Sequence, residues 1–300
     1  MQIGLLLSGL TDAPALGALA AEAEALGFDS LWAGDHVAFP APIIDPLQML
    51  AIFASHTRRV RLGTCVYLLP LRHPTVVAKM VSSLDVVSAG RVIFGIGVGG
   101  EFPGEFQACG VPVTERGARC NEAIGVLRAL WKDADAEHTG KFFPFERVHL
   151  RPPPVQPGGP PIWVGGRTDA AVRRTARHGD GYVGYLLSPD SFRTRMAEIR
   201  QRAGTVGRGE APIAAALMTF AAVDAHRDAA VERAGAILGA MYGRDMRSAA
   251  ARYCIAGTAD DCRAAADQFA AAGVEHLILT PLAYGDGQAE QVRLLAATLR

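Results

Sequence analysis

The sequence predicts a (β/α)8 TIM barrel, an α/β fold in which eight parallel strands form a closed cylinder inside a ring of helices. Short apolar segments alternate with longer amphipathic segments along the chain, and this alternation is typical of a parallel sheet covered by helices. Eight apolar segments can be distinguished, which is the number that closes a barrel. A length of 300 residues also suits one barrel domain.

The predicted strands are short apolar runs that end at glycine, proline or polar residues. The first covers 2–7 and ends at Ser8-Gly9, after which Asp12 and Pro14 supply the cap and first turn of a helix. The other strands are predicted at 28–33, 60–66, 92–96, 162–164, 182–184, 213–220 and 277–280. Apolar residues at helical spacing predict helices at 12–26, 46–57, 74–89, 119–132, 169–178, 189–203, 226–243, 259–272 and 288–299.

Two segments interrupt the alternation. Residues 136–160 contain a hairpin-like pattern followed by a proline-rich run, and residues 244–257 show no strong periodicity. Both segments are longer than ordinary connections, so we expect insertions that act as lids or extend a sheet edge. Neither changes composition enough to mark a second domain, and residues 1–300 are predicted to form a single domain.

An open, doubly wound sheet is the alternative architecture. Gly95, Gly97 and Gly100 formally match the dinucleotide-binding fingerprint. That fingerprint opens a helix and belongs to the first strand of its sheet. Here Pro103 and Gly104 follow, and the strand is the fourth. The sequence therefore favours the barrel over an NAD-dependent Rossmann enzyme.

Composition excludes several classes of partner. Lys plus Arg and Asp plus Glu number 30 each, so no net field attracts nucleic acid or anionic lipid. The first residues lack the basic segment of a signal peptide, and the longest apolar stretch, 211–223, is too short to span a bilayer. We expect a cytoplasmic protein that binds a small-molecule substrate and neither nucleic acid nor membrane.

The cysteines are predicted to be free thiols. The chain has five, none of them in a C-x-x-C pair, which argues against structural zinc and a disulfide framework. No metal site is expected. Cys65 lies near the end of the third strand without an evident neighbouring base, so packing is favoured over a role as nucleophile.

Polar residues follow the second strand, where a barrel gathers its catalytic groups at one mouth. This strand ends at Asp35-His36. The adjacent acid and imidazole can transfer a proton or orient a substrate near neutral pH. The structural alternative is that Asp35 braces a loop and His36 packs as an aromatic ring.

The fourth strand runs into a glycine-rich segment. Without a Cβ, Gly97, Gly99 and Gly100 let a ligand approach the backbone closely. Glu101 follows directly and is a candidate acid, base or hydrogen-bond acceptor. A flexible loop with a solvated carboxylate is the alternative.

Gly165 and Gly166 follow the fifth strand immediately before a predicted helix. Exposed N–H groups and the dipole at a helix N-terminus suit a phosphate, and Arg167 adds a cation. Tyr182 on the sixth strand is close enough in the predicted barrel to share this site. An ordinary strand-to-helix turn is the alternative.

Taken in order, these segments resemble the bacterial-luciferase-like superfamily (luciferase-like monooxygenases and F420-dependent oxidoreductases), whose members use FMN or the deazaflavin F420. The resemblance runs nearly end to end, and the order and spacing of its pieces identify the family. The strongest matches are at 31–37, 62–64, 71–74, 84–91, 95–101, 161–166 and 179–182.

The resemblance implies a tricyclic cofactor in the mouth of the barrel. Its phosphate would lie near Gly165-Gly166, with His36 against the reactive face of the ring and Glu101 as an acid. It also implies a non-prolyl cis bond between Cys65 and Val66. The resulting catalytic candidates are His36, Glu101 and Asp35. The cofactor-binding candidates are Ser8, His36, Cys65, Val66, Gly97, Gly99, Gly100, Gly165, Gly166, Arg167 and Tyr182.

The cofactor expected from the resemblance is F420, used for hydride transfer on a small apolar organic substrate. Sugar-phosphate oxidation is disfavoured, because such enzymes carry a tryptophan shortly after the histidine and a carboxylate just after the first strand. Here the loop after the histidine reads Val37-Ala38-Phe39-Pro40, and Ser8-Gly9 follows the first strand. One alternative is an FMN-dependent monooxygenase that activates oxygen and is served by a separate flavin reductase. Another is a non-catalytic flavin-binding barrel. The resemblance further implies a homodimer paired through the helices after the second and third strands.

Overall fold

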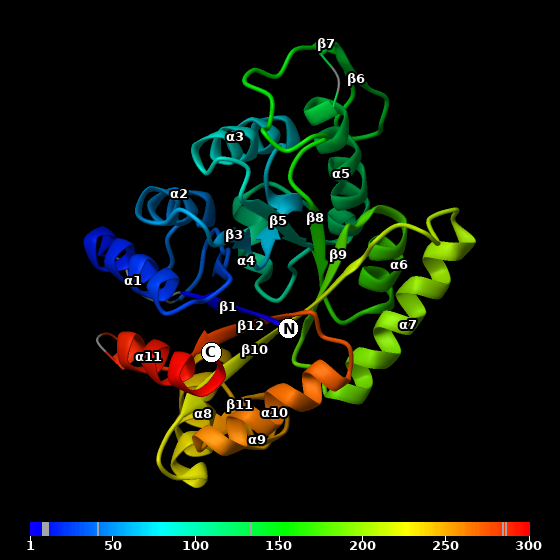
Figure 1. Cartoon of the computed structure of the whole chain (residues 1–300). Coiled ribbons are helices and arrows are strands. Elements are labelled where there is room, and N and C mark those ends of the chain that lie inside the picture. The colour runs from blue at the N-terminus through cyan, green and yellow to red at the C-terminus, as the bar shows by residue number, and fades with distance from the viewer. Residues whose placement is uncertain (8–11, 41, 133, 284, 286) are drawn as a thin grey trace.

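The computed structural model describes residues 1–300 except 8–11, 41, 133, 284 and 286. Eight parallel strands form a closed barrel at its centre (Figure 1). They are β1 (Gln2–Leu6), β2 (Ser30–Ala33), β3 (Arg61–Thr64), β5 (Val92–Gly97), β8 (Ile162–Gly165), β9 (Gly181–Tyr185), β10 (Ala214–Val223) and β12 (His276–Pro281). Pairing of β10 with both β12 and β9 closes the ring. The predicted barrel is therefore confirmed, and the open Rossmann sheet is wrong.

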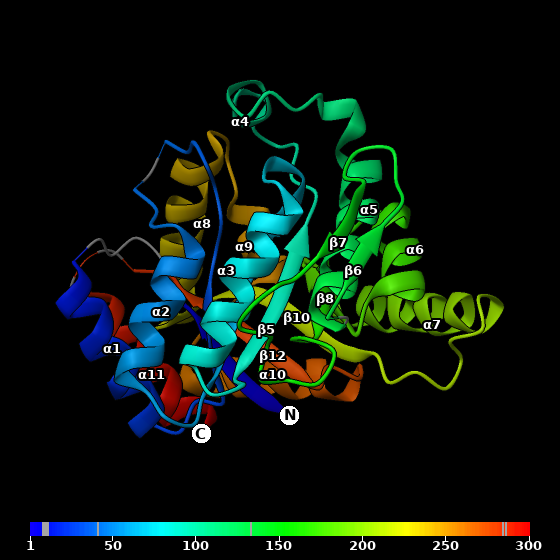
Figure 2. The same cartoon turned by 90° about the horizontal axis from the view of Figure 1, so that it is seen from above.

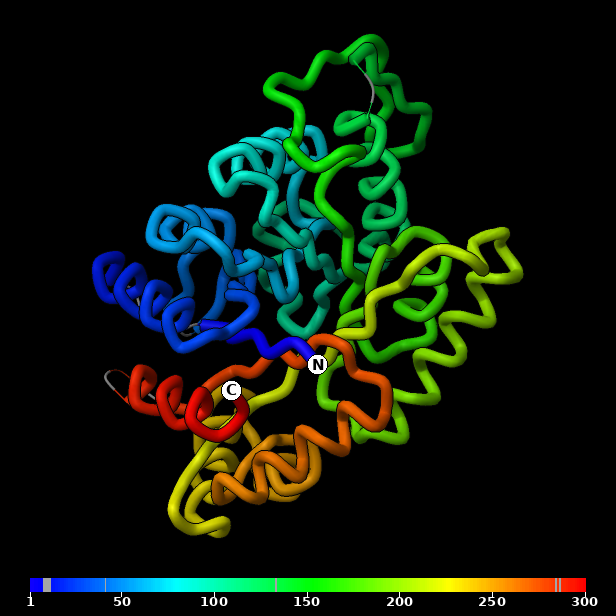
Figure 3. The backbone as a smooth tube through the Cα atoms, viewed as in Figure 1, coloured from blue at the N-terminus to red at the C-terminus, as the bar shows by residue number. Residues whose placement is uncertain are grey.

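Helices surround the barrel as the chain passes once around it (Figures 1 and 3). They are α1 (Ala13–Ala25), α2 (Pro46–His56), α3 (Pro74–Val87), α5 (Arg116–Lys132), α6 (Asp169–His178), α7 (Pro189–Thr205), α8 (Arg227–Tyr242), α10 (Ala259–Ala271) and α11 (Gly287–Leu299). Side chains that accept backbone N–H groups begin many of them, among them Asp12 at α1, Thr168 at α6 and Thr258 at α10. Such caps satisfy N–H groups that have no partner inside the helix.

The two insertions occupy different places. Residues 136–160 contain β6 (Ala136–His138) and β7 (Phe145–Val148), an antiparallel pair beside α5 on the outside of the barrel (Figure 1). Residues 244–257 contain α9 (Arg247–Tyr253) and β11 (Ile255–Gly257), and β11 extends the sheet by pairing with β10. The sequence did not predict the short elements near the mouth: β4 (Tyr67–Leu68), η1 (Leu69–Leu71), α4 (Pro103–Ala108) and η2 (Val113–Glu115).

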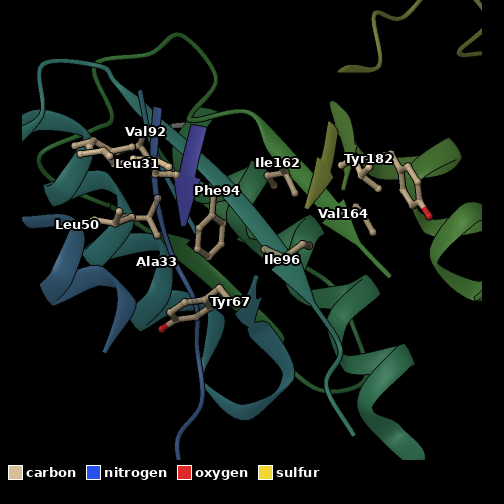
Figure 4. Close-up of a cluster of buried hydrophobic side chains, with 14 of the residues drawn as sticks. Leu31, Ala33, Leu50, Tyr67, Val92, Phe94, Ile96, Ile162, Val164 and Tyr182 are labelled. Carbon is tan, nitrogen blue, oxygen red and sulfur yellow. The ribbon is translucent and has the colours of Figure 1, made fainter. Parts of the chain in front are cut away.

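The larger part of the core lies between the strands and the helices. Figure 4 shows side chains from β2, β5 and β8 packed there with Leu50 of α2. Strands in this fold are buried on both faces, which explains their nearly continuous apolar sequences.

A second core fills the barrel. The rings of Trp32 and Trp163 lie 5.4 Å apart, and each meets His276 edge-on. Gly63 makes room for Trp32, since a Cβ at position 63 would lie 2.1 Å from a ring carbon of that tryptophan. The buried Ser30 hydroxyl accepts the indole N–H of Trp32 and contacts His276 Nε2 at 2.6 Å. The interior is thus packed, and ligands can enter only at an end.

The two ends of the barrel differ. In Figure 2 both chain termini lie at one end, and α4 projects from the opposite end, where the strands finish. Barrel enzymes place their chemistry at this carboxyl end. No helix among the described residues has the length and apolar character needed to cross a membrane.

Candidate functional site

Val66 brings three strand ends together at the mouth. A Cβ on Gly97 would lie 2.6 Å from Val66 Cγ2, and a Cβ on Gly165 would lie 2.7 Å from Val66 Cγ1. Glycines at both positions therefore allow Val66 to lie across the ends of β5 and β8. The Cys65–Val66 peptide bond is cis, as the resemblance implied. The result is an apolar platform at the top of the packed barrel interior.

His36, in the loop after β2, is held by a glutamate that the sequence did not single out. Its Nδ1 lies 3.0 Å from Oε1 of Glu105 in α4. The same oxygen accepts the backbone N–H groups of Val37 and Ala38 at 3.0 and 3.1 Å. The Glu105 side chain is 1% exposed, and that of His36 is 24% exposed. One carboxylate oxygen thus organises the whole turn that carries the histidine.

Two phenylalanines complete the surroundings of His36. Phe39 stacks on the imidazole with centroids 4.2 Å apart and an interplanar angle of 11°. Phe102, from the loop after β5, meets the edges of both rings at 5.1 and 5.0 Å. Such contacts keep aromatic rings in defined orientations. Phe39 occupies the loop in which the resemblance led us to note a missing tryptophan.

Asp35 is paired with Arg72, and among the described residues no hydrogen bond joins it to His36. Its two carboxylate oxygens accept hydrogen bonds from the Arg72 guanidinium at 2.6 and 2.8 Å, and one oxygen also accepts the Leu68 N–H at 2.8 Å. Burial raises the pKa of Asp35, and the hydrogen bonds from Arg72 oppose that rise. Burial lowers the pKa of Arg72, but the hydrogen bonds to Asp35 together with the charges of Asp35, Tyr67 and Asp45 give a net rise of that pKa. This geometry favours the bracing role over the expected catalytic pair.

Glu101 follows the glycine-rich end of β5 and has different electrostatic neighbours from His36. It is exposed, and no hydrogen bond joins it to His36 among the described residues. Its charge instead acts on Tyr185 and Tyr242, whose hydroxyls are hydrogen-bonded to each other. Burial raises the pKa of Tyr185 strongly, and the neighbouring Tyr242 and Glu101 add to the shift. Tyr185 lies on β9, which is four strand-to-strand steps from β2 in either direction, so the charge of Glu101 acts on groups in a part of the barrel remote from the strand that leads to His36.

The other glycines of this loop take up backbone conformations that suit glycine. Gly99 and Gly100 have φ values of +60° and +114°, in the region that other residues rarely adopt. A Cβ on Gly100 would also lie 3.0 Å from Nε of Arg116. These two glycines therefore shape the turn that leads to Glu101.

The start of α6 is where the sequence predicted a phosphate seat, and the N–H groups available there are not that of Gly166. The Gly166 N–H already donates to the carbonyl of Val183, so the open N–H groups are those of the first helical turn, at Asp169 and Ala170. Arg167 is exposed beside them, with its guanidinium 5.5 Å from the centre of the Tyr185 ring. A helix start with a free cation suits a phosphate.

Tyr182, Cys65 and Ser8 stand apart from these groups. Tyr182 packs in the outer core (Figure 4), and its hydroxyl donates to the Gly166 carbonyl at 2.7 Å, which supports the loop from behind. Cys65 lies in the barrel interior, where burial raises the pKa of its thiol to about 12; this favours packing over nucleophilic chemistry. Ser8 is outside the described residues. In the part of the chain that the structure describes, no three His, Cys, Asp or Glu side chains are grouped to hold a metal ion.

Sequence reasoning missed Glu105, Arg72, Phe102 and Tyr242. Only Glu105 carries a local signal, because it stands in the first turn of a helix that begins at Pro103 and acidic residues are favoured there. The others are recognisable only through their partners.

Comparison with known proteins agrees with this geometry. The model of the family described as luciferase-like monooxygenase matches residues 3–294. An uncharacterised protein of Mycobacterium tuberculosis is 32% identical over 209 residues, which are 62% of this chain and 71% of that protein. The oxygenase component of flavin-dependent trigonelline monooxygenase from Acinetobacter baylyi is 36% identical over 143 residues, 47% of this chain and 39% of the relative. A phthiodiolone/phenolphthiodiolone dimycocerosates ketoreductase of M. tuberculosis is 30% identical over 240 residues, 72% of this chain and 62% of the relative.

Solved structures show the same fold over the whole chain. The monooxygenase RslO1 from Streptomyces bottropensis has a TM-score of 0.84 at 25% identity, covering 100% of this chain and 98% of that one. An F420-dependent secondary alcohol dehydrogenase has a TM-score of 0.87 at 21% identity, covering 99% and 98%.

Proposed function

Because the chain belongs to the luciferase-like monooxygenase family, we propose that it is an oxidoreductase that binds F420 and uses it for hydride transfer on a small apolar organic substrate. The mouth of the barrel carries this proposal. Val66 forms an apolar platform between Gly97 and Gly165, His36 is partly exposed, and the start of α6 with Arg167 offers a seat for an anion. These residues fit a flat ring system with a phosphate-bearing tail.

Bound F420 would supply the hydride chemistry, and the residues of the chain would supply binding, orientation and a dry environment. The first turn of α6 and Arg167 bind the phosphate. Phe39 and Phe102 keep water from His36 and favour an apolar substrate. Nε2 of His36 has no hydrogen-bond partner among the described residues. It is therefore the atom that can accept a proton from a substrate hydroxyl and then hold it.

The cofactor test uses the full chain purified from a host that makes both F420 and FMN. We expect the absorption spectrum and the mass of the released cofactor to identify F420. Retention of FMN at full occupancy would refute the F420 proposal.

A matched pair of arginine variants tests the phosphate seat. Arg167→Ala should weaken F420 binding about tenfold, since a hydrogen bond to a charged group contributes roughly 1.5–3 kcal/mol. The control is Arg173→Ala, which removes an exposed cation of α6; this arginine pairs with Asp169. Equal affinities of the two variants would contradict the assignment of Arg167.

An FMN-dependent monooxygenase is the second candidate function. It is favoured by the similarity to the trigonelline oxygenase component and to RslO1. It predicts oxygen consumption with reduced FMN supplied by a separate flavin reductase, and a loss of substrate oxygenation in His36→Ala. A non-catalytic flavin-binding barrel would instead show no activity that His36→Ala changes.

We also propose a homodimer, with α3 in the interface. Val76, Val86 and Val87 of this helix are 57%, 41% and 65% exposed, and pairing with a second copy of the chain would remove these side chains from water. Light scattering should give twice the mass of the chain, and Val76→Glu with Val87→Glu should give the monomer. A monomeric wild type would contradict the proposal.

A further inference from the structure

The contacts of Glu105 point to a role that goes beyond holding a loop. Its Oε1 lies 3.0 Å from His36 Nδ1 while it also accepts two backbone N–H groups. An oxygen that already accepts two N–H groups belongs to an ionised carboxylate or a carbonyl, which has no hydrogen to give to the ring. The hydrogen between Oε1 and Nδ1 must therefore sit on Nδ1.

We propose that Glu105 is a positioning residue that keeps the proton of His36 on Nδ1 and leaves the lone pair of Nε2 free for the bound substrate. In a neutral imidazole one nitrogen carries hydrogen and the other accepts, and the hydrogen bond made by one nitrogen decides which. Nε2 has no competing partner among the described residues, so the choice lies with Glu105.

The surroundings of the pair add to this control. Glu105 is 1% exposed, so water does not compete for its oxygen. Stacking on Phe39 and the edge of Phe102 oppose rotation of the ring. A flip about χ2 would turn a carbon towards Glu105 and lose the hydrogen bond. Tautomer and orientation are therefore set together, before any ligand binds.

The test reads the tautomer directly, without cofactor or turnover. A two-bond proton–nitrogen correlation spectrum of the full chain labelled with 15N-histidine is recorded at pH 8.5. The signal of His36 is assigned from its loss in His36→Asn. We expect the nitrogen shifts of the His36 ring to show Nδ1 protonated in the wild type, and we call this pattern the Nδ1–H signal. A proton on Nε2 of His36 in the wild type overturns the proposal, whichever variants fold.

Three variants separate positioning from simple support. Glu105→Ala removes the acceptor and should abolish the Nδ1–H signal. Glu105→Gln keeps a carbonyl oxygen, which the N–H groups of Val37 and Ala38 turn towards the ring, so it should retain the signal. The control, Glu115→Gln, removes a carboxylate that pairs with Arg119 and should leave the spectrum unchanged. Retention of the Nδ1–H signal in Glu105→Ala overturns the proposal.

Measurements of kcat and of the cofactor Kd extend the test, and these rest on the proposed function. Loss of such an orienting partner typically lowers activity about 10–100-fold, and we expect that fall in kcat for Glu105→Ala with recovery in Glu105→Gln. The cofactor Kd should change little, because Glu105 contacts His36 and its turn. An unchanged kcat in a Glu105→Ala variant that has lost the Nδ1–H signal overturns the functional part. If the cofactor is not F420, the spectra still decide the tautomer, so the two failures remain distinguishable.

Discussion

Substitution of Asp35 by Asn removes the charge that holds Arg72 while keeping the shape of the side chain. Removing one partner of a buried ion pair costs about 3–5 kcal/mol. Here the Arg72 side chain is 20% exposed, and its guanidinium also lies 3.3 Å from Asp45, so part of its charge remains compensated. We therefore expect the free energy of unfolding to fall by about 2–3 kcal/mol.

The assay is urea unfolding followed by circular dichroism at pH 7.5, with linear extrapolation to water. Asp190→Asn is the control, because Asp190 pairs with Arg193 on the surface and should cost about 0.5 kcal/mol or less. Turnover per folded molecule of Asp35→Asn should stay within about tenfold of wild type, whereas loss of a general acid or base typically costs about 10²–10⁴-fold. Unchanged stability together with a 100-fold loss of turnover would refute the bracing role.

The reciprocal variant, Arg72→Met, should respond to pH in a defined direction. Burial raises the pKa of Asp35, and Arg72 opposes that rise; without Arg72 the folded-state pKa lies further above the unfolded value. A raised folded-state pKa stabilises the protein below the unfolded pKa and loses that stabilisation as pH rises. Relative to wild type, Arg72→Met should thus lose stability above about pH 4, measured by unfolding at pH 4.5, 6 and 7.5.

Three further predictions follow from the packed interior. Burial lowers the pKa of His276 to about 4, so its contribution to stability is complete above about pH 6.5 and is lost as pH falls. Between pH 7.5 and 5.0 the free energy of unfolding should fall by about 2 kcal/mol more in wild type than in His276→Gln. An equal fall in the two proteins would contradict this. Gly63→Ala places a Cβ 2.1 Å from Trp32 and should destabilise by about 1–3 kcal/mol or more, with altered tryptophan fluorescence; an unchanged melting temperature would oppose it. Burial raises the pKa values of Cys65 and Cys254 to about 12, so iodoacetamide at pH 8 should leave both unlabelled in the native protein by mass spectrometry and label them in urea.

Much of the mouth could be predicted because it lies at strand ends. His36, Val66, Gly97 and Gly165 each follow or end a strand, and a closed parallel barrel brings such positions to one face. The partners of these residues could not be predicted in the same way. Glu105 is 69 residues from His36 in sequence, and no periodic pattern connects them.

Two carboxylates of the predicted site show what the sequence could not decide. Asp35 and His36 are adjacent in sequence, but their side chains take different partners, Arg72 and Glu105. Glu101 precedes Glu105 by only four residues. It follows the turn formed by Gly99 and Gly100, and its charge acts on Tyr185 and Tyr242. Sequence reasoning pointed to the loops after these strands, but it could not decide which carboxylate binds His36 and which binds Arg72.

The sequence by itself determined the barrel, because burial on both faces imposes an apolar pattern that is legible along the chain. The order and spacing of its motifs, through their resemblance to known proteins, determined the family. Only the tertiary structure decided that Glu105 holds His36, that Asp35 braces Arg72 and that the Gly166 N–H is taken by the Val183 carbonyl. These outcomes depend on how loops from different strands pack over the mouth. Such packing joins residues far apart in the chain, and no local preference encodes it.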